Sequence, residues 1–330
     1  MNLETQYLGF TLPHPLMLGA GPLSDTLDGI RQAEDAGAAA VVLRSLFEEQ
    51  ITAESMSAHR SVDYHANSFG EALSFLPSPE EYMLGPEEYI EHVQRARHAV
   101  KIPVIASLNG STLGRWLEYA QLIEQAGASA LELNVFQIPT SPDESAVAIE
   151  ERTAQVVLEV RHKIKIPLAI KLSPFYTAPA HFAAKLEEAG ASGFVLFNRF
   201  FEPDISLEDL EYTSHLHLSQ PSELLLRLRW LAILSGHVEG SLAVTGGVHS
   251  GIDAVKAIMS GANAVQVVSA VLKHGIGHIG HMLQEIKTWM AEHEYESIQQ
   301  MCGSMNLLRC PDPASLLRGN YIHMLQTWQP

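Results

Sequence analysis

Polar side chains stand at the ends of several short apolar runs in this chain. Lys171 interrupts the run LAIKLSP, Asn134 ends ALELN, and Asn198 and Arg199 follow GFVLF. Amides and cationic side chains hydrogen-bond or neutralise a polar, anionic ligand, whereas a purely apolar core gains nothing from them. The residues that end such runs are Ala20, Gly21, Arg44, Ser45, Ser107, Asn109, Asn134, Ser173, Asn198, Arg199, Thr245, Gly246, Gly247 and Ser269.

The segment TGGVHSGIDAVKAI indicates an anion site. Gly246 and Gly247 follow one apolar run, and Ser250 with Asp253 forms a capping box that opens a helix. Glycines allow backbone N–H groups to approach an anion, and a helix N-terminus favours negative charge. The run VVSAVLKHG, with Ser269, supplies a second helix start. We therefore predict phosphate binding here; a tight turn without a ligand is the alternative.

Lys171 lies within an apolar run. Burial of a cation there is costly unless the ammonium meets an anion or the side chain works as a desolvated, neutral amine. Two chemical roles fit: an ammonium that neutralises negative charge on a reduced cofactor, or an amine that forms a Schiff base. A lysine that reaches solvent at the rim is the structural alternative.

Four copies of one phrase organise the chain: EDAGAAAVVL, EQAGASALEL, EEAGASGFVL and MSGANAVQVV. Each combines a helix end, a glycine and a short apolar run, and apolar runs opened mostly by proline interleave with them. Eight strand–helix units favour a (β/α)8 TIM barrel, with a doubly wound open sheet as the alternative. The strands are expected near 15–20, 39–44, 103–108, 130–134, 167–172, 193–198, 241–245 and 264–268.

The barrel accounts for one domain over 1–330. Segments at about 47–100 and 199–240 are too long for simple connections, and we interpret them as insertions at the carboxyl ends of the strands. A C-terminal extension covers about 275–330.

The composition excludes several classes of protein. Asp and Glu number 38 against 21 Lys and Arg, a formal charge of −17, so nucleic acid and anionic membrane are not expected partners. No apolar run reaches the length of about 18 residues that a membrane span needs. Cys302 and Cys310 are too few for a disulfide framework or an iron–sulfur cluster. A soluble, cytoplasmic protein is expected. No metal site is predicted, because the helical row His274, His278 and His281 lacks an acidic ligand.

The order of these motifs resembles the dihydroorotate dehydrogenase family of FMN-dependent barrels. LGAGPLS, SLNG, LELN, IKLSP, LFNRF, TGGVHSGIDA and the GSM…DP…R.NYI tail follow the family order over nearly the whole chain. The resemblance implies FMN, with its phosphate at Gly246, Gly247 and Ser269 and with Lys171 near the flavin N1/O2 edge. The other cofactor- or substrate-binding residues that it implies are Ala20, Gly21, Arg44, Ser45, Asn109, Asn134 and Asn198.

Two positions depart from the family pattern. Arg44 replaces a lysine, and Gln137 stands where the family has a catalytic Cys or Ser. An amide has no useful basicity, so Gln137 cannot take a substrate proton. The nearest hydroxyls that could substitute belong to Thr140 and Ser141. The candidate catalytic residues are Lys171, Gln137 and Ser141, and the chain resembles a diverged branch of the family.

The resemblance implies an oxidoreductase that passes hydride between a small cyclic dihydropyrimidine-like substrate and flavin N5. A homodimer is expected, and an electron-transfer protein is a candidate partner. Two alternatives stay open: an aldolase or isomerase that binds a phosphorylated substrate and uses the Lys171 amine, and an FMN-binding protein without dehydrogenase activity.

Overall fold

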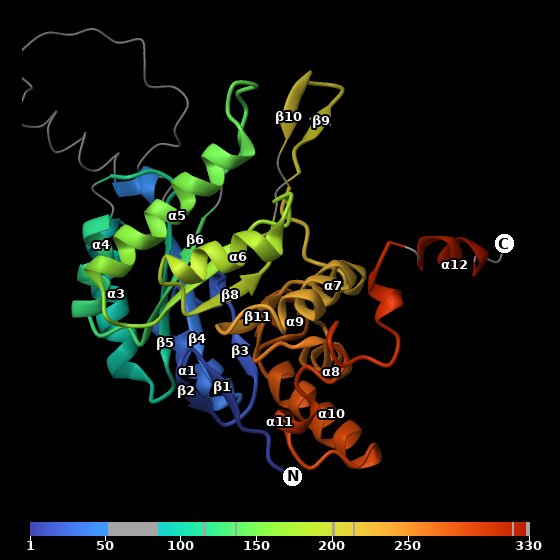
Figure 1. Ribbon diagram of the computed structural model, residues 1–330. Coiled ribbons are helices and arrows are strands. Elements are labelled where there is room, and N and C mark those ends of the chain that lie inside the picture. The colour runs from blue at the N-terminus through green and yellow to red at the C-terminus, as the bar shows by residue number, and fades with distance from the viewer. Residues whose placement is uncertain are drawn as a thin grey trace, which may run out of the picture.

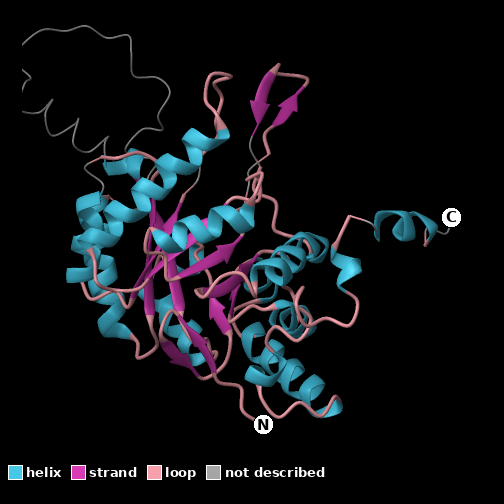
Figure 2. Cartoon of the chain, viewed as in Figure 1, coloured by secondary structure: helices cyan, strands magenta, loops and turns pink. Residues whose placement is uncertain are grey.

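Eight parallel strands form a closed barrel in the computed structural model, which describes residues 1–51, 85–114, 117–135, 137–199, 202–213, 215–318 and 320–327. The strand order around the barrel is β11-β12-β3-β4-β5-β6-β7-β8, with β8 pairing with β11 to close it. Helices surround the strands (Figures 1 and 2). The predicted (β/α)8 barrel is therefore confirmed, and the open doubly wound sheet is excluded.

All eight barrel strands coincide with the predicted apolar runs to within a few residues. They are β3 (Leu16–Leu18), β4 (Val41–Phe47), β5 (Val104–Asn109), β6 (Ala130–Asn134), β7 (Leu168–Leu172), β8 (Gly193–Leu196), β11 (Ser241–Thr245) and β12 (Ala264–Val267).

The predicted glycine stops also hold, because the four glycines that end the repeat helices have positive φ angles of 91°, 93°, 103° and 122° at Gly37, Gly127, Gly190 and Gly261. The described helices of the barrel wall are α1 (Leu27–Asp35), α3 (Pro86–Ala99), α4 (Leu117–Gln125), α5 (Ala146–Lys163), α6 (Pro179–Glu188), α7 (Leu224–Leu234), α8 (Gly251–Ser260) and α9 (Ser269–His274).

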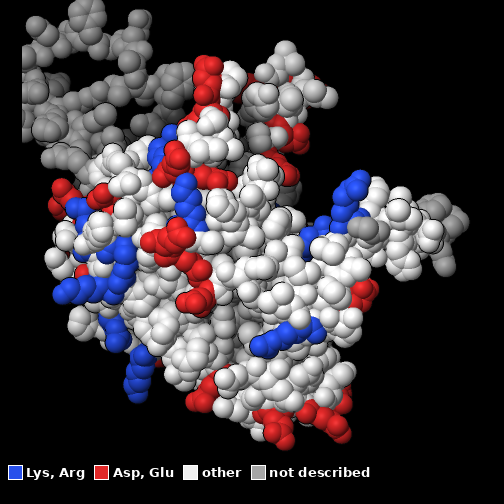
Figure 3. All heavy atoms as spheres, viewed as in Figure 1, with Lys and Arg blue, Asp and Glu red and all other residues white. Residues whose placement is uncertain are grey.

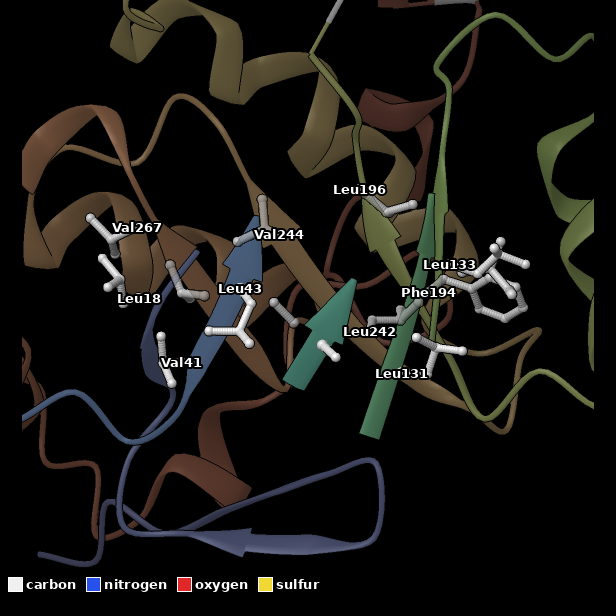
Figure 4. Close-up of a cluster of buried hydrophobic side chains, with 14 of the residues drawn as sticks. Leu18, Val41, Leu43, Leu131, Leu133, Phe194, Leu196, Leu242, Val244 and Val267 are labelled. Carbon is white, nitrogen blue, oxygen red and sulfur yellow. The ribbon is translucent and has the colours of Figure 1, made fainter. Parts of the chain in front are cut away.

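Alternate residues of each strand face the helices, as the two-residue period of a strand requires. Figure 4 shows part of the resulting apolar cluster, which Leu131 and Leu133 of β6, Phe194 and Leu196 of β8 and their neighbours form. These side chains are fully buried, so the barrel wall and its helices share one core.

The other set of alternate residues fills the barrel interior. At the amino ends of the strands this layer is small and apolar, with alanines such as Ala130, Ala169 and Ala264. An N-terminal hairpin, β1 (Thr5–Tyr7) and β2 (Phe10–Leu12), contributes Tyr7, Leu8 and Leu12 to the same cluster. The small alanines leave room for these side chains, so the hairpin closes this end of the barrel. The hairpin was not predicted.

The long segments contain additional elements. The first predicted insertion includes the wall helix α3, and its residues 52–84 lie outside the described part of the chain. The second contains the hairpin β9 (Asp204–Ser206) and β10 (Glu211–Thr213), which projects from the barrel in Figure 1, as well as η3 (Pro221–Glu223) and α7. The remaining elements are η1 (Pro22–Ser24), α10 (His278–Glu292), α11 (Ile298–Met301), η4 (Pro313–Leu316) and α12 (Asn320–Gln326). Within the described residues, no helix has the length and hydropathy needed to cross a bilayer.

Candidate functional site

A cavity of about 430 Å³ opens where the barrel strands end. This volume lies within the range of roughly 300–1,000 Å³ that is usual for ligand sites. Residues from β3, β4, β6, β7, β8, β11 and β12, or directly after them, line it together with the start of α7. The wall includes Ala20, Gly21, Arg44, Ser45, Asn134, Lys171, Phe197, Asn198, Arg199, Ser219, Glu223, Arg227, Thr245, Gly246, Gln266, Val268 and Ser269.

The cavity brings together most of the residues that the sequence indicated. Nine of the eleven candidate cofactor-binding residues line it: Ala20, Gly21, Arg44, Ser45, Asn134, Lys171, Asn198, Gly246 and Ser269. Asn109 and Gly247 are buried next to the cavity wall but are not part of it. Asn109 is paired in register with Asn134 at the ends of β5 and β6.

Lys171 meets a carboxylate in the barrel interior. Its Nζ lies 3.4 Å from Oε1 of Glu132, whose side chain is 1% exposed. The amide Nε2 of Gln266 donates to the other oxygen, Oε2, at 2.5 Å. Glu132 is two residues after Ala130, and Gln266 is two after Ala264, so both lie one layer above the apolar floor. Lys171 is thus a buried, paired cation rather than a rim lysine that reaches solvent.

Arg44 forms an ion pair with Asp25, with Nη2 2.6 Å from Oδ2. Asp25 belongs to the loop after β3, so this ion pair joins that loop to the neighbouring strand β4. Burial raises the pKa of Asp25, while the charge of Arg44 and that of His92 oppose the rise. Arg44 is therefore already engaged before any ligand binds.

Ser45 is fixed by a network behind the cavity wall. Its hydroxyl shares a hydrogen bond of 2.7 Å with that of Ser107. The hydroxyl of Tyr89 donates to the Ser107 carbonyl and accepts the Ser107 N–H, both at 2.9 Å. Because Tyr89 comes from α3, this network joins the wall helix to β4 and β5.

The glycine turn after β11 packs against α7. Gly246 and Gly247 have φ angles of 83° and 80°, which side chains seldom adopt. A Cβ on Gly246 would lie 2.7 Å from Nη2 of Arg227, and one on Gly247 would overlap the backbone of Leu224. Arg227 is 6% exposed and donates to the carbonyls of Thr245 and Glu223. The turn therefore holds a buried guanidinium at the cavity wall.

Ser219 lies across the predicted phosphate cradle. Its hydroxyl accepts the Gly247 N–H at 3.1 Å, and its own N–H donates to the Ser269 hydroxyl at 3.0 Å. The two groups predicted to hold an anion are thus bridged by one small polar residue from the second insertion.

Backbone N–H groups at the start of α8 already donate hydrogen bonds to carboxylates of this chain. The predicted capping box is present, with Asp253 accepting the N–H groups of His249 and Ser250. Glu285 of α10 accepts the Gly251 N–H at 2.5 Å. These donors are consumed, so the α8 N-terminus contributes less to an anion site than its sequence suggested.

The loop after β6 lies beside the cavity rather than in it. Gln137 and Ser141 do not line the cavity. The Gln137 Oε1 is buried without a hydrogen-bond partner among the described residues, and the exposed Ser141 hydroxyl accepts the Asp143 N–H at 3.2 Å. Gln137 thus presents a buried amide outside the cavity wall, and Ser141 presents a hydroxyl to solvent.

The cavity wall is richer in cations than the chain as a whole. Among the described residues, four cations, Arg44, Lys171, Arg199 and Arg227, line it with one acid, Glu223, whereas the whole chain has a formal charge of −17. On the face shown in Figure 3, acidic and basic side chains are interspersed over the outer surface. Burial lowers the pKa of Arg227 and the charge of Arg199 lowers it further, while Glu223 opposes both. Neighbouring guanidiniums of this kind favour an anionic ligand.

Glu132, Gln266, Ser219 and Arg227 were missed by the sequence analysis. Glu132 and Gln266 had a signal, since each is a polar residue inside an apolar run, as Lys171 is. Arg227 also lies inside an apolar run, LLLRLRWLAIL, and carried the same signal, whereas Ser219 lies in a loop, where no pattern indicates burial.

Fold and site define a (β/α)8 barrel with a cavity lined by cationic side chains at the carboxyl ends of its strands, the face on which barrel enzymes carry their active sites. The family model described as dihydroorotate dehydrogenase matches residues 2–290. The chain belongs to the dihydroorotate dehydrogenase family, as the motifs indicated.

Individual relatives are similar at modest identity. The catalytic subunit of dihydroorotate dehydrogenase B (NAD(+)) from Thermoplasma volcanium is 27% identical over 310 residues, covering 92% of this chain and 98% of the relative. That from Pyrococcus abyssi is 26% identical over 316 residues, covering 91% and 98%. The chloroplastic dihydropyrimidine dehydrogenase (NADP(+)) from Arabidopsis thaliana is 22% identical over 327 residues, covering 92% and 76%. All three are dehydrogenases, which supports an oxidoreductase and a diverged member of the family.

Proposed function

We propose that this protein is an FMN-dependent oxidoreductase that acts on the CH–CH bond of a small cyclic, dihydropyrimidine-like substrate. The observation that carries the proposal is the cationic cavity, in which Lys171, Asn134 and Asn198 surround one space. The names of the relatives, dihydroorotate and dihydropyrimidine dehydrogenases, support the substrate class.

The residues present fit FMN. The cavity has an orphaned buried acceptor, Oδ1 of Asn134, and the Gly246 turn would be blocked by any side chain. The phosphate would be held by Gly246, Gly247 and Ser269, and the ring by Ala20, Gly21, Ser45, Asn134, Lys171 and Asn198. FMN, when bound, supplies the hydride acceptor; the chain supplies orientation, charge and exclusion of water.

Lys171 acts as an ammonium in this proposal. A Schiff-base lysine needs a neutral amine, which proteins obtain by desolvation or a neighbouring cation. Here the partner of Lys171 is the Glu132 carboxylate, 3.4 Å away, which is an anion and not a neighbouring cation. This contact argues against the aldolase or isomerase alternative.

Gln137 makes dihydroorotate a poor first choice of substrate. An amide in the position of the catalytic base removes proton abstraction from that loop, and Ser141 is exposed and outside the cavity. We propose that the substrate is a related ring whose oxidation does not depend on a Cys or Ser base there.

The test is an absorption spectrum of the purified protein with and without added FMN, followed by anaerobic titration with dihydroorotate, dihydrouracil and dihydrothymine. Flavin that binds and is bleached by a dihydropyrimidine other than dihydroorotate is the expected result. Bleaching by dihydroorotate at enzymatic rates would contradict the argument from Gln137. Bound flavin that only a reducing partner protein bleaches would favour the FMN-binding protein without dehydrogenase activity.

Failure to bind FMN would overturn the proposal. Borohydride trapping of a phosphorylated aldehyde or ketone on Lys171, tested in parallel with Lys171→Met as control, would then establish the amine enzyme.

A further inference from the structure

A polar layer occupies the barrel interior directly beneath the cavity. Glu132 and Gln266 are each 1% exposed, and Lys171 is 9% exposed. Barrel interiors at this level are ordinarily packed with apolar side chains. Below the layer lie the alanines and the N-terminal hairpin, whose Tyr7 hydroxyl is buried.

Stability alone does not explain a buried ion pair here. Desolvation of two charges offsets much of their attraction, and apolar replacements of such pairs are often neutral or stabilising. The charge of Glu132 is sensed beyond its direct contacts: burial raises the pKa of Tyr7, and the Glu132 carboxylate raises it further. The Glu132 side chain is therefore near enough to the hairpin for its carboxylate to act on Tyr7 inside the barrel.

Glu132 does not line the cavity, whereas Lys171 and Gln266 do. Each of its two oxygens is directed to one of these residues, Oε1 to Lys171 Nζ and Oε2 to Gln266 Nε2. Glu132 thus bears on a ligand in the cavity through its charge and through the two side chains that it contacts.

We propose that Glu132 is a positioning residue that fixes the Lys171 ammonium and the Gln266 amide at the cavity floor and sets the floor's net charge. The ligand chemistry that such a floor recognises is a ring edge with carbonyl oxygens on which negative charge develops. The inference rests on the proposed function in naming FMN as that ligand, but the positioning itself concerns this chain alone.

The first experiment is a charge cycle on the FMN-loaded protein, using wild type, Glu132→Gln, Lys171→Met and the double variant. The readout is the ratio of reduced to oxidised flavin at one applied potential. Glu132→Gln removes a negative charge and should raise the ratio roughly tenfold, because reduced flavin is the more negative form. Lys171→Met should lower it, and the double variant should return toward wild type.

A merely structural role for Glu132 predicts a different pattern. Glu132→Gln and Lys171→Met would then change the ratio in the same direction, or not at all, and either result would overturn the proposal. Should Glu132→Gln fail to fold, Glu132→Asp keeps the charge but withdraws it from Lys171 by one methylene. Glu132→Asp should raise the ratio of reduced to oxidised flavin by less than Glu132→Gln does. An unchanged ratio would contradict the positioning role of Glu132.

A second experiment needs no flavin. Competitive acetylation of the protein as purified, followed by mass spectrometry, compares Lys171 with the exposed Lys165. Without its carboxylate partner the Lys171 amine should react about tenfold faster in Glu132→Gln, while Lys165 is unchanged. Equal Lys171 rates would refute the positioning role. Because this result does not depend on FMN, failure of the proposed function and failure of this inference are distinguishable.

Discussion

The hydroxyl of Ser219 accepts the backbone N–H of Gly247 at 3.1 Å, 28 residues further along the chain. The same residue donates its N–H to Ser269. One serine from the second insertion therefore connects the glycine turn to the first residue of α9 by two hydrogen bonds, at the place where the sequence predicts a phosphate.

Negative charge at Ser219 should discriminate between phosphorylated and unphosphorylated flavin. We expect Ser219→Asp to weaken FMN binding about tenfold or more through like-charge repulsion. Ser219→Ala should change it only slightly. Fluorescence titration with FMN measures both variants, and riboflavin, which lacks the phosphate, is the matched ligand control. Equal weakening of FMN and riboflavin by Ser219→Asp would place the phosphate elsewhere.

Removing one partner of the interior ion pair should destabilise the fold more than removing both. Lys171→Met leaves Glu132 buried without its cation, and we expect a loss of roughly 3–5 kcal/mol in the free energy of unfolding. Lys171→Met with Glu132→Met should cost much less, because both charges are gone. Urea denaturation of wild type, Lys171→Met and the double variant measures the three free energies of unfolding. A double variant no more stable than Lys171→Met would mean that the two residues do not interact.

Asp25 should give the protein a pH-dependent loss of stability. Burial raises the pKa of Asp25 above its ordinary 3.8, so the folded state binds this proton more tightly than the unfolded state. The contribution of Asp25 to the free energy of unfolding is therefore complete below pH 3.8, and it decreases as the pH rises through the pKa of Asp25 in the folded state.

The variant Asp25→Asn cannot ionise at this position, so it should lack the pH-dependent decrease in stability that Asp25 causes. The difference in melting temperature, variant minus wild type, should become more positive as the pH increases from 3.5 upward. A constant difference across this range would show that Asp25 does not titrate abnormally. Glu4, an exposed carboxylate near the N-terminus, provides the control variant Glu4→Gln, which should show no such trend.

A base at position 137 should create activity toward dihydroorotate. Gln137→Cys supplies an ionisable group in place of the amide, and general bases contribute about 10²–10⁴-fold to proton-transfer rates. We expect faster anaerobic bleaching of bound flavin by dihydroorotate, increasing with pH as the thiol ionises. Gln137→Ala, which adds no base, is the control. Equal rates in both variants would mean that the loop after β6 does not face the reacting carbon.

The expected homodimer can be tested at the C-terminal helix. Tyr321, Ile322, Met324 and Leu325 of α12 are 55–67% exposed, and apolar side chains gathered in this way often mark association surfaces. If α12 joins two copies, Leu325→Asp should shift the mass measured by light scattering from dimer to monomer. Leu207→Asp in the projecting β9–β10 hairpin, where Leu207 is 81% exposed, is the matched control. A dimer that survives Leu325→Asp would exclude α12.

The amino-acid sequence predicted the barrel and nine of the residues that line the cavity. The repeated glycines and apolar runs located all eight strands, because buried parallel strands have nearly continuous apolar sequences. Once the strands were placed, residues at their carboxyl ends had to meet, and nine candidates do so. Lys171 was recognisable since a cation inside an apolar run needs an explanation.

The tertiary structure alone decided which groups pair with one another. Glu132 and Gln266 are 134 residues apart, and Ser219 reaches Gly247 and Ser269 from a separate insertion. The N-terminal hairpin fits the barrel because the alanines opposite it are small. Such contacts depend on the direction of each side chain after the barrel closes, and local sequence patterns carry no information about that direction between distant strands.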